Sequence, residues 1–154
     1  MSHSLLGKYK MNNSLDLVPL GKTDIKITTV GVGAWAWGDR MIWGYGGSSY
    51  DDSDIRAAFD VSLANGTNWF DTAEVYGMGK SEKFLGKFLP FATNEVLIAT
   101  KFFPFPWRMR KTALVNALNK SLKRLQRSQV DLYQIHVPLG RWSKPEYVSA
   151  LADA

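Results

Sequence analysis

The order of apolar and polar residues along the chain predicts short strands that alternate with helices. Strand-like runs occur at residues 29–33, 67–71, 95–101 and 130–136. Between these runs, apolar residues recur at the helical spacing of three or four positions. Strands joined through helices imply right-handed crossovers and a parallel sheet. The pattern therefore predicts the α/β fold class.

The predicted helices differ in how clearly their ends are marked. The first begins near residues 51–53, which offer N-cap side chains, and ends at Gly66. A short helix over residues 81–89 is stopped by Pro90. The next has the clearest apolar period, with leucines at 114, 118, 122 and 125. Pro145 begins a last helix, which runs to the end of the sequence without a glycine cap.

The amino-terminal part follows a different pattern. Residues 1–14 are polar and unpatterned, which predicts a flexible leader. Residues 15–20 and 25–29 are short strand-like runs around turn residues, which predicts a β-hairpin. No linker divides residues 15–154, so we expect one domain there. Its uncapped last helix leads us to expect a domain that is incomplete at its C-terminus.

Composition narrows the function classes. The 154 residues include no cysteine, which excludes disulfides and thiolate metal sites, and we expect no metal centre. No apolar run is long enough for a signal peptide or a membrane span, which favours a soluble cytoplasmic protein without a membrane partner. The net charge is +5, but the basic residues form no continuous tract, so we expect no nucleic-acid partner. Six basic residues lie in or beside the third helix, where a solvated face is the simplest interpretation: 110, 111, 120, 123, 124 and 127.

Three ionisable residues stand at the last position of successive predicted strands: Asp71, Lys101 and His136. Carboxyl ends of parallel strands are where active sites are built in this fold class. Tyr76 lies shortly after Asp71, and a nearby ammonium such as Lys101 would stabilise its phenolate. Asp71 could hold that lysine, and His136 could donate a hydrogen bond to a substrate oxygen. Each residue alone has an ordinary structural explanation, but their joint placement favours a catalytic site.

A second motif is less specific. Gly31, Gly33 and Ala36 match a dinucleotide-binding G-x-G-x-x-A fingerprint. That fingerprint should open a helix directly, whereas here a loop rich in tryptophan and glycine spans residues 34–50. This context disfavours a Rossmann domain. The loop still suits contact with a flat ring.

Four segments carry a resemblance to a known family. Residues 66–77, which include Asp71 and Tyr76, continue through Gly79-Lys-Ser-Glu82 to Gly86. Residues 97–101, 121–125 and 131–136 complete the series. In order and spacing they resemble the aldo-keto reductase motifs around the catalytic aspartate, tyrosine, lysine and histidine. The resemblance spans residues 15–154.

The resemblance implies a TIM-type (β/α)₈ barrel closed at its base by the hairpin, of which this chain holds about the first four βα units. It implies NADPH-dependent reduction of aldehydes or ketones, with Tyr76 as general acid assisted by Lys101, Asp71 and His136. Ala34, Trp35 and Asp71 match positions near the nicotinamide. Trp35, Trp43 and the aromatic loop at residues 102–107 would wall an apolar substrate pocket, although simple packing could equally explain that loop.

A complete barrel needs about 250 residues. Family members carry most contacts to the rest of the cofactor in later strands, so the resemblance covers only the catalytic part. The alternatives are a catalytically inactive half-barrel, or an interaction or regulatory subunit like the family members that regulate potassium channels. Exposed half-barrel edges would favour self-association. A Schiff-base aldolase that uses Lys101 is a further enzyme class, but it leaves the spacing of Asp71 and Tyr76 unexplained.

Overall fold

A computed structural model describes residues 15–108, 110–137 and 145–152. The predicted leader at residues 1–14 lies outside the described residues. Strands and α-helices occur in the order β1 (Leu17–Pro19), β2 (Lys26–Thr28), β3 (Val32–Gly33), α1 (Asp52–Ala64), β4 (Trp69–Asp71), α2 (Lys80–Phe88), β5 (Leu97–Phe102), α3 (Thr112–Leu125), β6 (Leu132–Ile135) and α4 (Pro145–Ala152). Two 3₁₀ turns, η2 (Tyr76–Gly79) and η3 (Leu89–Phe91), flank α2.

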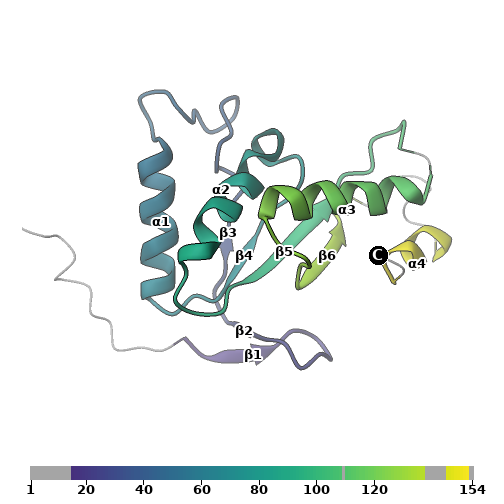
Figure 1. Ribbon diagram of the computed structural model, residues 1–154, viewed down its shortest axis with the longest axis horizontal. Coiled ribbons are helices and arrows are strands. Elements are labelled where there is room, and N and C mark those ends of the chain that lie inside the picture. Colours follow the sequence, from purple (N-terminus) through teal and green to yellow (C-terminus); the bar gives the residue numbers. More distant parts are fainter. Residues whose placement is uncertain (1–14, 109, 138–144, 153–154) are drawn as a thin grey trace, which may run out of the picture.

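The main sheet has the strand order β3-β4-β5-β6, and every neighbouring pair is parallel. Helices α1, α2 and α3 connect the successive strands and lie along one side of the sheet (Figure 1). The parallel sheet with alternating helices confirms the predicted fold class. Within the described chain the sheet is an open part of a barrel, with β3 and β6 at its edges.

The strands are shorter than the sequence predicted. The first parallel pair joins Val32 to Phe70, so Val30, which was expected in an edge strand, precedes β3 and is 57% exposed. Gly31 explains this late start, because a Cβ atom at this position would lie 2.2 Å from the Trp69 indole. The backbone at Gly31 therefore packs against the Trp69 ring before the chain pairs with β4 at Val32.

The hairpin of β1 and β2 is fastened to the end of the sheet at which β4 begins. Asn68, just before β4, accepts a hydrogen bond from the Thr28 amide at 2.8 Å and donates one to the Lys26 carbonyl at 2.8 Å. The Trp69 indole N–H donates to the Thr28 carbonyl at 3.1 Å. Figure 1 shows the hairpin below the strands, on the side opposite their carboxyl ends.

The start of α1 and the end of α2 follow residues that the sequence offers for these roles. The Asp51 carboxylate accepts from the Ser53 amide at 2.7 Å, and the Asp54 carboxylate accepts from the Asp51 amide at 2.9 Å, which makes a reciprocal capping box. Helix α2 ends before Pro90, as predicted, although η3 continues the helical path through the proline.

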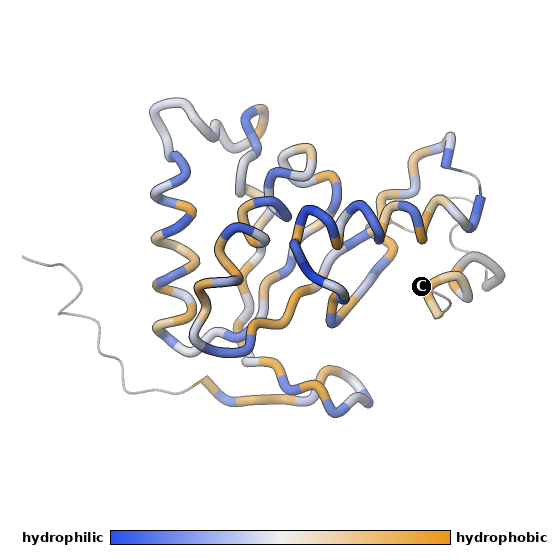
Figure 2. Tube along the Cα trace, in the orientation of Figure 1, coloured by the Kyte–Doolittle hydropathy of each residue, from blue (hydrophilic) through white to orange (hydrophobic). Residues whose placement is uncertain are grey.

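Helices α1 and α2 bury their apolar faces against the sheet, and α3 and α4 form a second cluster with β5. In Figure 2, hydrophilic (blue) and hydrophobic (orange) segments alternate along the helices, as expected for helices with one apolar and one polar face. Two residues expected in functional loops belong to these cores. Trp37 packs against Phe70 with ring centroids 5.9 Å apart, and Phe102 is fully buried beside Leu114. Phe102 therefore does not wall a substrate pocket, because strand alternation turns it toward α3.

In the part of the chain that the structure describes, no helix combines the length and the apolar character needed to cross a membrane.

Candidate active site

The register of β4 and β5 brings Asp71 and Lys101 together. Asp71 pairs with Ala99, and Lys101 lies two residues further along β5, on the same face as Ala99. The Lys101 ammonium donates to the Asp71 carboxylate at 2.6 Å and to the Thr72 carbonyl at 2.8 Å. The exposed fractions of the two side chains are 13% for Lys101 and 31% for Asp71. The ion pair is thus shielded from water on the lysine side and open on the other.

Tyr76 follows β4 in the turn η2, and its hydroxyl lies between two nitrogen groups. Lys101 Nζ donates to the Tyr76 hydroxyl at 3.5 Å and lies 5.0 Å from the centroid of its ring. His136 Nε2 lies 3.4 Å from the same hydroxyl, with the two rings edge to face. The structure therefore brings together all four residues that the sequence singled out.

The backbone after Tyr76 takes an uncommon path. Gly77, Met78 and Gly79 all have positive φ, at 53°, 56° and 85°. A Cβ atom at Gly77 would lie 2.8 Å from the Gly38 backbone, so this turn needs glycine for close approach as well as for its conformation. The turn packs the Tyr76 segment against the loop at residues 34–50, which restricts where the tyrosine can point.

His136 lies one residue beyond β6, but its amide still donates to the Phe102 carbonyl at 2.8 Å. Burial lowers the pKa of His136, and the Lys101 charge lowers it further, against smaller opposing effects of Asp71 and Glu74. The lowered pKa favours the neutral imidazole, which can donate only one hydrogen bond. Among the described residues, its buried Nδ1 atom has no hydrogen-bond partner.

Aromatic side chains flank the four residues on two sides. Trp35 and Trp43 are 47% and 45% exposed, and their rings meet edge to face 5.6 Å apart. The Trp35 ring centroid lies 6.2 Å from that of Tyr76. On the other side, Phe103 lies 5.6 Å from the His136 ring. Flat apolar surfaces thus border the polar centre.

Glu74 holds the loop that carries Phe103, and sequence reasoning missed it. Its carboxylate accepts from the Phe103 amide at 2.7 Å and forms an ion pair with Arg108. The Arg108 guanidinium lies 5.4 Å from the Phe105 ring centroid, where it makes a cation–π contact. An acid placed between Asp71 and Tyr76 was the available signal, but its partner, 34 residues further along, could not be identified from sequence.

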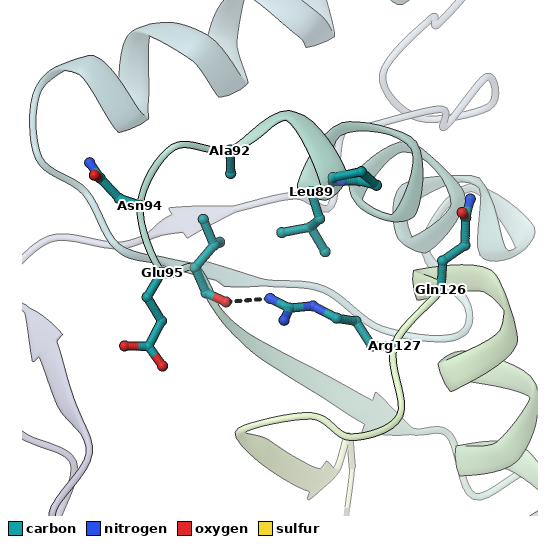
Figure 3. Close-up of a pocket in the computed structure, with 8 residues that line it drawn as sticks. Leu89, Ala92, Asn94, Glu95, Gln126 and Arg127 are labelled. Atoms are coloured by element: carbon teal, nitrogen blue, oxygen red, sulfur yellow. Dashed lines mark hydrogen bonds between the residues drawn. The ribbon is translucent and has the colours of Figure 1, made fainter.

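A separate cavity of about 240 Å³ lies at the opposite end of β5. Figure 3 shows Leu89, Glu95 and Arg127 around it, with Arg127 donating to the Val96 carbonyl at 2.7 Å. Val96 directly precedes β5, whereas Lys101 lies near its carboxyl end. This cavity is therefore not part of the candidate site, and its arginine fastens the start of the strand.

Comparisons with family models, curated proteins and solved structures all find similarity to reductases. The family model described as "Aldo/keto reductase family" matches residues 29–154. The chain is 41% identical over 133 residues to "Pyridoxal reductase, chloroplastic" from Arabidopsis thaliana, a match that covers 80% of this chain and 34% of that protein. The chain thus spans about a third of the length of this curated relative.

Solved structures with a similar fold include the following two. A Pseudomonas aeruginosa protein described as a putative aldo-keto reductase superimposes with a TM-score of 0.80 at 23% identity, over 95% of this chain and 59% of that one. At this identity the likeness concerns the fold. An aldo-keto reductase from Klebsiella pneumoniae in complex with NADPH gives a TM-score of 0.64 at 26% identity, over 83% of this chain and 41% of that one.

The geometry predicts how the His136 titration responds to its neighbours. Replacing Lys101 by glutamine removes a positive charge beside the imidazole, so we expect the pKa of His136 to rise. Asp71→Asn should lower it, because Asp71 raises this pKa. NMR of histidine-labelled chain can follow the titration, since the chain has only two histidines and His136→Gln assigns the signal.

Lys120→Gln is the matched control, because it removes the same charge from an exposed position on α3. A His136 midpoint that moves equally in Lys101→Gln and Lys120→Gln would contradict the described contact between Lys101 and the site.

Proposed function

The chain belongs to the aldo/keto reductase family, a family of oxidoreductases, and we propose that it supplies the catalytic side chains for NADPH-dependent reduction of aldehydes or ketones to alcohols. One observation carries the proposal. Lys101 Nζ lies 2.6 Å from the Asp71 carboxylate and 3.5 Å from the Tyr76 hydroxyl. This arrangement places a fixed positive charge beside a phenol that can give up its proton.

Each of the four residues takes a role that its surroundings support. Tyr76 donates a proton to the carbonyl oxygen as that oxygen gains negative charge. Lys101 stabilises the phenolate that remains, and Asp71 holds the ammonium in place through their ion pair. The neutral His136 donates a hydrogen bond to the same oxygen and orients the carbonyl.

The surroundings of Tyr76 also fit a nicotinamide ring. The half-exposed Trp35 indole beside the tyrosine offers a flat surface, and Ala34, Trp35 and Asp71 are the residues that we assign to this end of the cofactor. NADPH, when bound, supplies the hydride. The chain's own residues supply the proton and exclude water from the lysine side of the ion pair.

For the substrate we propose a carbonyl compound with a flat apolar body. Trp35 lies beside Tyr76 and contacts Trp43, and Phe103 lies beside His136, so a ring could lie between these aromatic side chains. Pyridoxal is the first compound to assay, because a relative that is 41% identical is named a pyridoxal reductase.

The complete (β/α)₈ barrel and a cytoplasmic location are also part of the proposal. An inactive half-barrel or a regulatory subunit is the alternative function. The four-residue constellation favours catalysis, because a purely structural domain has no need for a lysine held against a tyrosine hydroxyl at a strand end.

A Schiff-base aldolase at Lys101 is less well supported. Schiff-base formation needs a neutral amine, which enzymes obtain by desolvating the lysine or by placing another cation beside it. Lys101 instead donates to a carboxylate and a carbonyl, and both contacts stabilise the charged form. Borohydride trapping of a covalent adduct on Lys101 with a carbonyl substrate would favour the aldolase.

Tyr76→Phe tests the proposed proton donor. In a protein of family length that contains this chain, we expect kcat for pyridoxal or another aldehyde to fall by about 10² or more, the usual scale for loss of a general acid. Tyr45→Phe is the control, since this tyrosine bonds to Asp52 away from the site. A variant Tyr76→Phe with normal kcat would refute the assigned role.

For the 154 residues alone we predict weak NADPH binding and little carbonyl reduction. The assigned residues contact only the nicotinamide end, and this small surface cannot offset the translational and rotational cost of association. Titration with NADPH, followed by tryptophan fluorescence, measures the affinity. A dissociation constant of about 1 μM or below would show that the main binding contacts lie within this chain.

Self-association through the sheet edges is the remaining proposal. In the described residues, β3 and β6 each have one edge without a neighbouring strand, and such edges recruit partners. We expect the isolated chain to elute from size-exclusion chromatography as a dimer or larger species. Elution as a single monomeric peak, with a sharp cooperative melt by near-UV circular dichroism, would contradict this expectation.

A further inference from the structure

Four polar side chains behind the candidate site are fully buried: Thr72, Ser81, Glu82 and Thr100. None of them belongs to the four residues assigned to the reaction. Buried polar groups are costly unless they are hydrogen-bonded, so each needs a partner. Their partners connect the first turn of α2 to the ends of three strands.

Ser81 joins the ends of β3 and β4. Its hydroxyl donates to the Ala34 carbonyl at 2.8 Å and lies 2.7 Å from the Thr72 hydroxyl. A serine has only one hydroxyl proton, and a carbonyl can only accept. Thr72 is therefore the donor in the second bond, and the direction of both bonds is fixed.

Glu82, the next residue of α2, reaches the end of β5. One carboxylate oxygen accepts from the Thr100 hydroxyl at 2.6 Å, and the other accepts from Arg124 Nε at 2.6 Å. Arg124 neutralises the buried charge and ties α3 to the same point, although the sequence had suggested a solvated basic face there.

Each residue held in this way lies at or just beyond the end of a strand and directly adjoins a residue assigned to the site, and Ala34 is itself one of the assigned residues. The neighbouring pairs are Ala34 with Trp35, Thr72 with Asp71, and Thr100 with Lys101. Thr72 is linked a second time, because its carbonyl accepts from the Lys101 ammonium at 2.8 Å. On the other side, the short turn η2 joins Tyr76 to the start of α2.

We propose that Ser81 and Glu82 are positioning residues, which set the ends of β3, β4 and β5 so that the Lys101 ammonium lies between Asp71 and Tyr76. The proposal rests on the proposed function for its effect on catalysis. The geometric part does not depend on turnover. A displaced strand end would move the ammonium away from both the Tyr76 hydroxyl and the His136 ring.

Ser81→Ala removes the acceptor of the Thr72 hydroxyl and one donor to the Ala34 carbonyl. The matched control is Ser121→Ala, which removes another fully buried serine hydroxyl, one that accepts from Arg124 Nη2 at 3.0 Å, while the bond from Arg124 Nε to Glu82 at 2.6 Å does not involve that hydroxyl. We expect both variants to lose stability. Only Ser81→Ala should lower kcat in the family-length protein, by about tenfold to a hundredfold, the scale expected for a misplacement near 1 Å.

The second readout is the NMR titration of His136 in the chain itself, which needs no activity. Lys101 lowers the pKa of His136, whereas Asp71 and Glu74 raise it. An ammonium that has moved away should let the midpoint rise in Ser81→Ala and leave it unchanged in Ser121→Ala. If no variant or wild-type protein reduces carbonyls, the proposed function fails, while this midpoint still tests the positioning.

If Ser81→Ala does not fold, two variants of Thr100 test the positioning role instead. Thr100→Val keeps the shape but removes the hydroxyl that Glu82 accepts from, and Thr100→Ser keeps the hydroxyl but loses a methyl group. If Glu82 positions the end of β5 through Thr100, Thr100→Val should raise the His136 midpoint and lower kcat. Thr100→Ser should restore the wild-type values of both. The proposal would be overturned if Thr100→Val and Thr100→Ser changed the His136 midpoint and kcat equally, or if Ser81→Ala and Ser121→Ala did.

Discussion

The 2.6 Å contact between Lys101 and Asp71 joins the carboxyl ends of two adjacent parallel strands. Its geometry follows from the register, because Asp71 lies opposite Ala99 and strand alternation turns Lys101 to the same face two residues later. The same ammonium reaches the Tyr76 hydroxyl, so the position of the phenol relative to the charge depends on the ion pair. Shielding of the lysine side makes this electrostatic contact stronger than it would be in water.

The structure surrounds that contact with groups that limit its movement. The hairpin fixes the beginning of β4 through Asn68, and α2 fixes the ends of the strands through Ser81 and Glu82. Tyr76 follows a strand and precedes the short turn into α2, so strand and helix both constrain it. Loops alone would hold a proton donor less exactly, because they lack the buried hydrogen bonds found here.

Much of this arrangement was predictable from local sequence, and the rest was not. The βα alternation and the strand-end residues Asp71, Lys101 and His136 follow from periodicity and from the general properties of parallel sheets. Strand lengths were overestimated, because contacts such as that between Gly31 and Trp69 cannot be read from composition. Arg124 was grouped with solvated cations, since its partner Glu82 lies 42 residues earlier and becomes its neighbour only in the folded chain.

The claim that Lys101 acts through Tyr76 is tested most directly by a double-mutant cycle on kcat in a protein of family length. The cycle compares wild type with Tyr76→Phe, Lys101→Met and the double variant, with NADPH and one aldehyde held constant. If the lysine works by stabilising the phenolate, Lys101→Met should cost almost nothing further once the phenol is gone. Losses that multiply in the double variant would contradict this account, because they would mean that the two residues contribute independently.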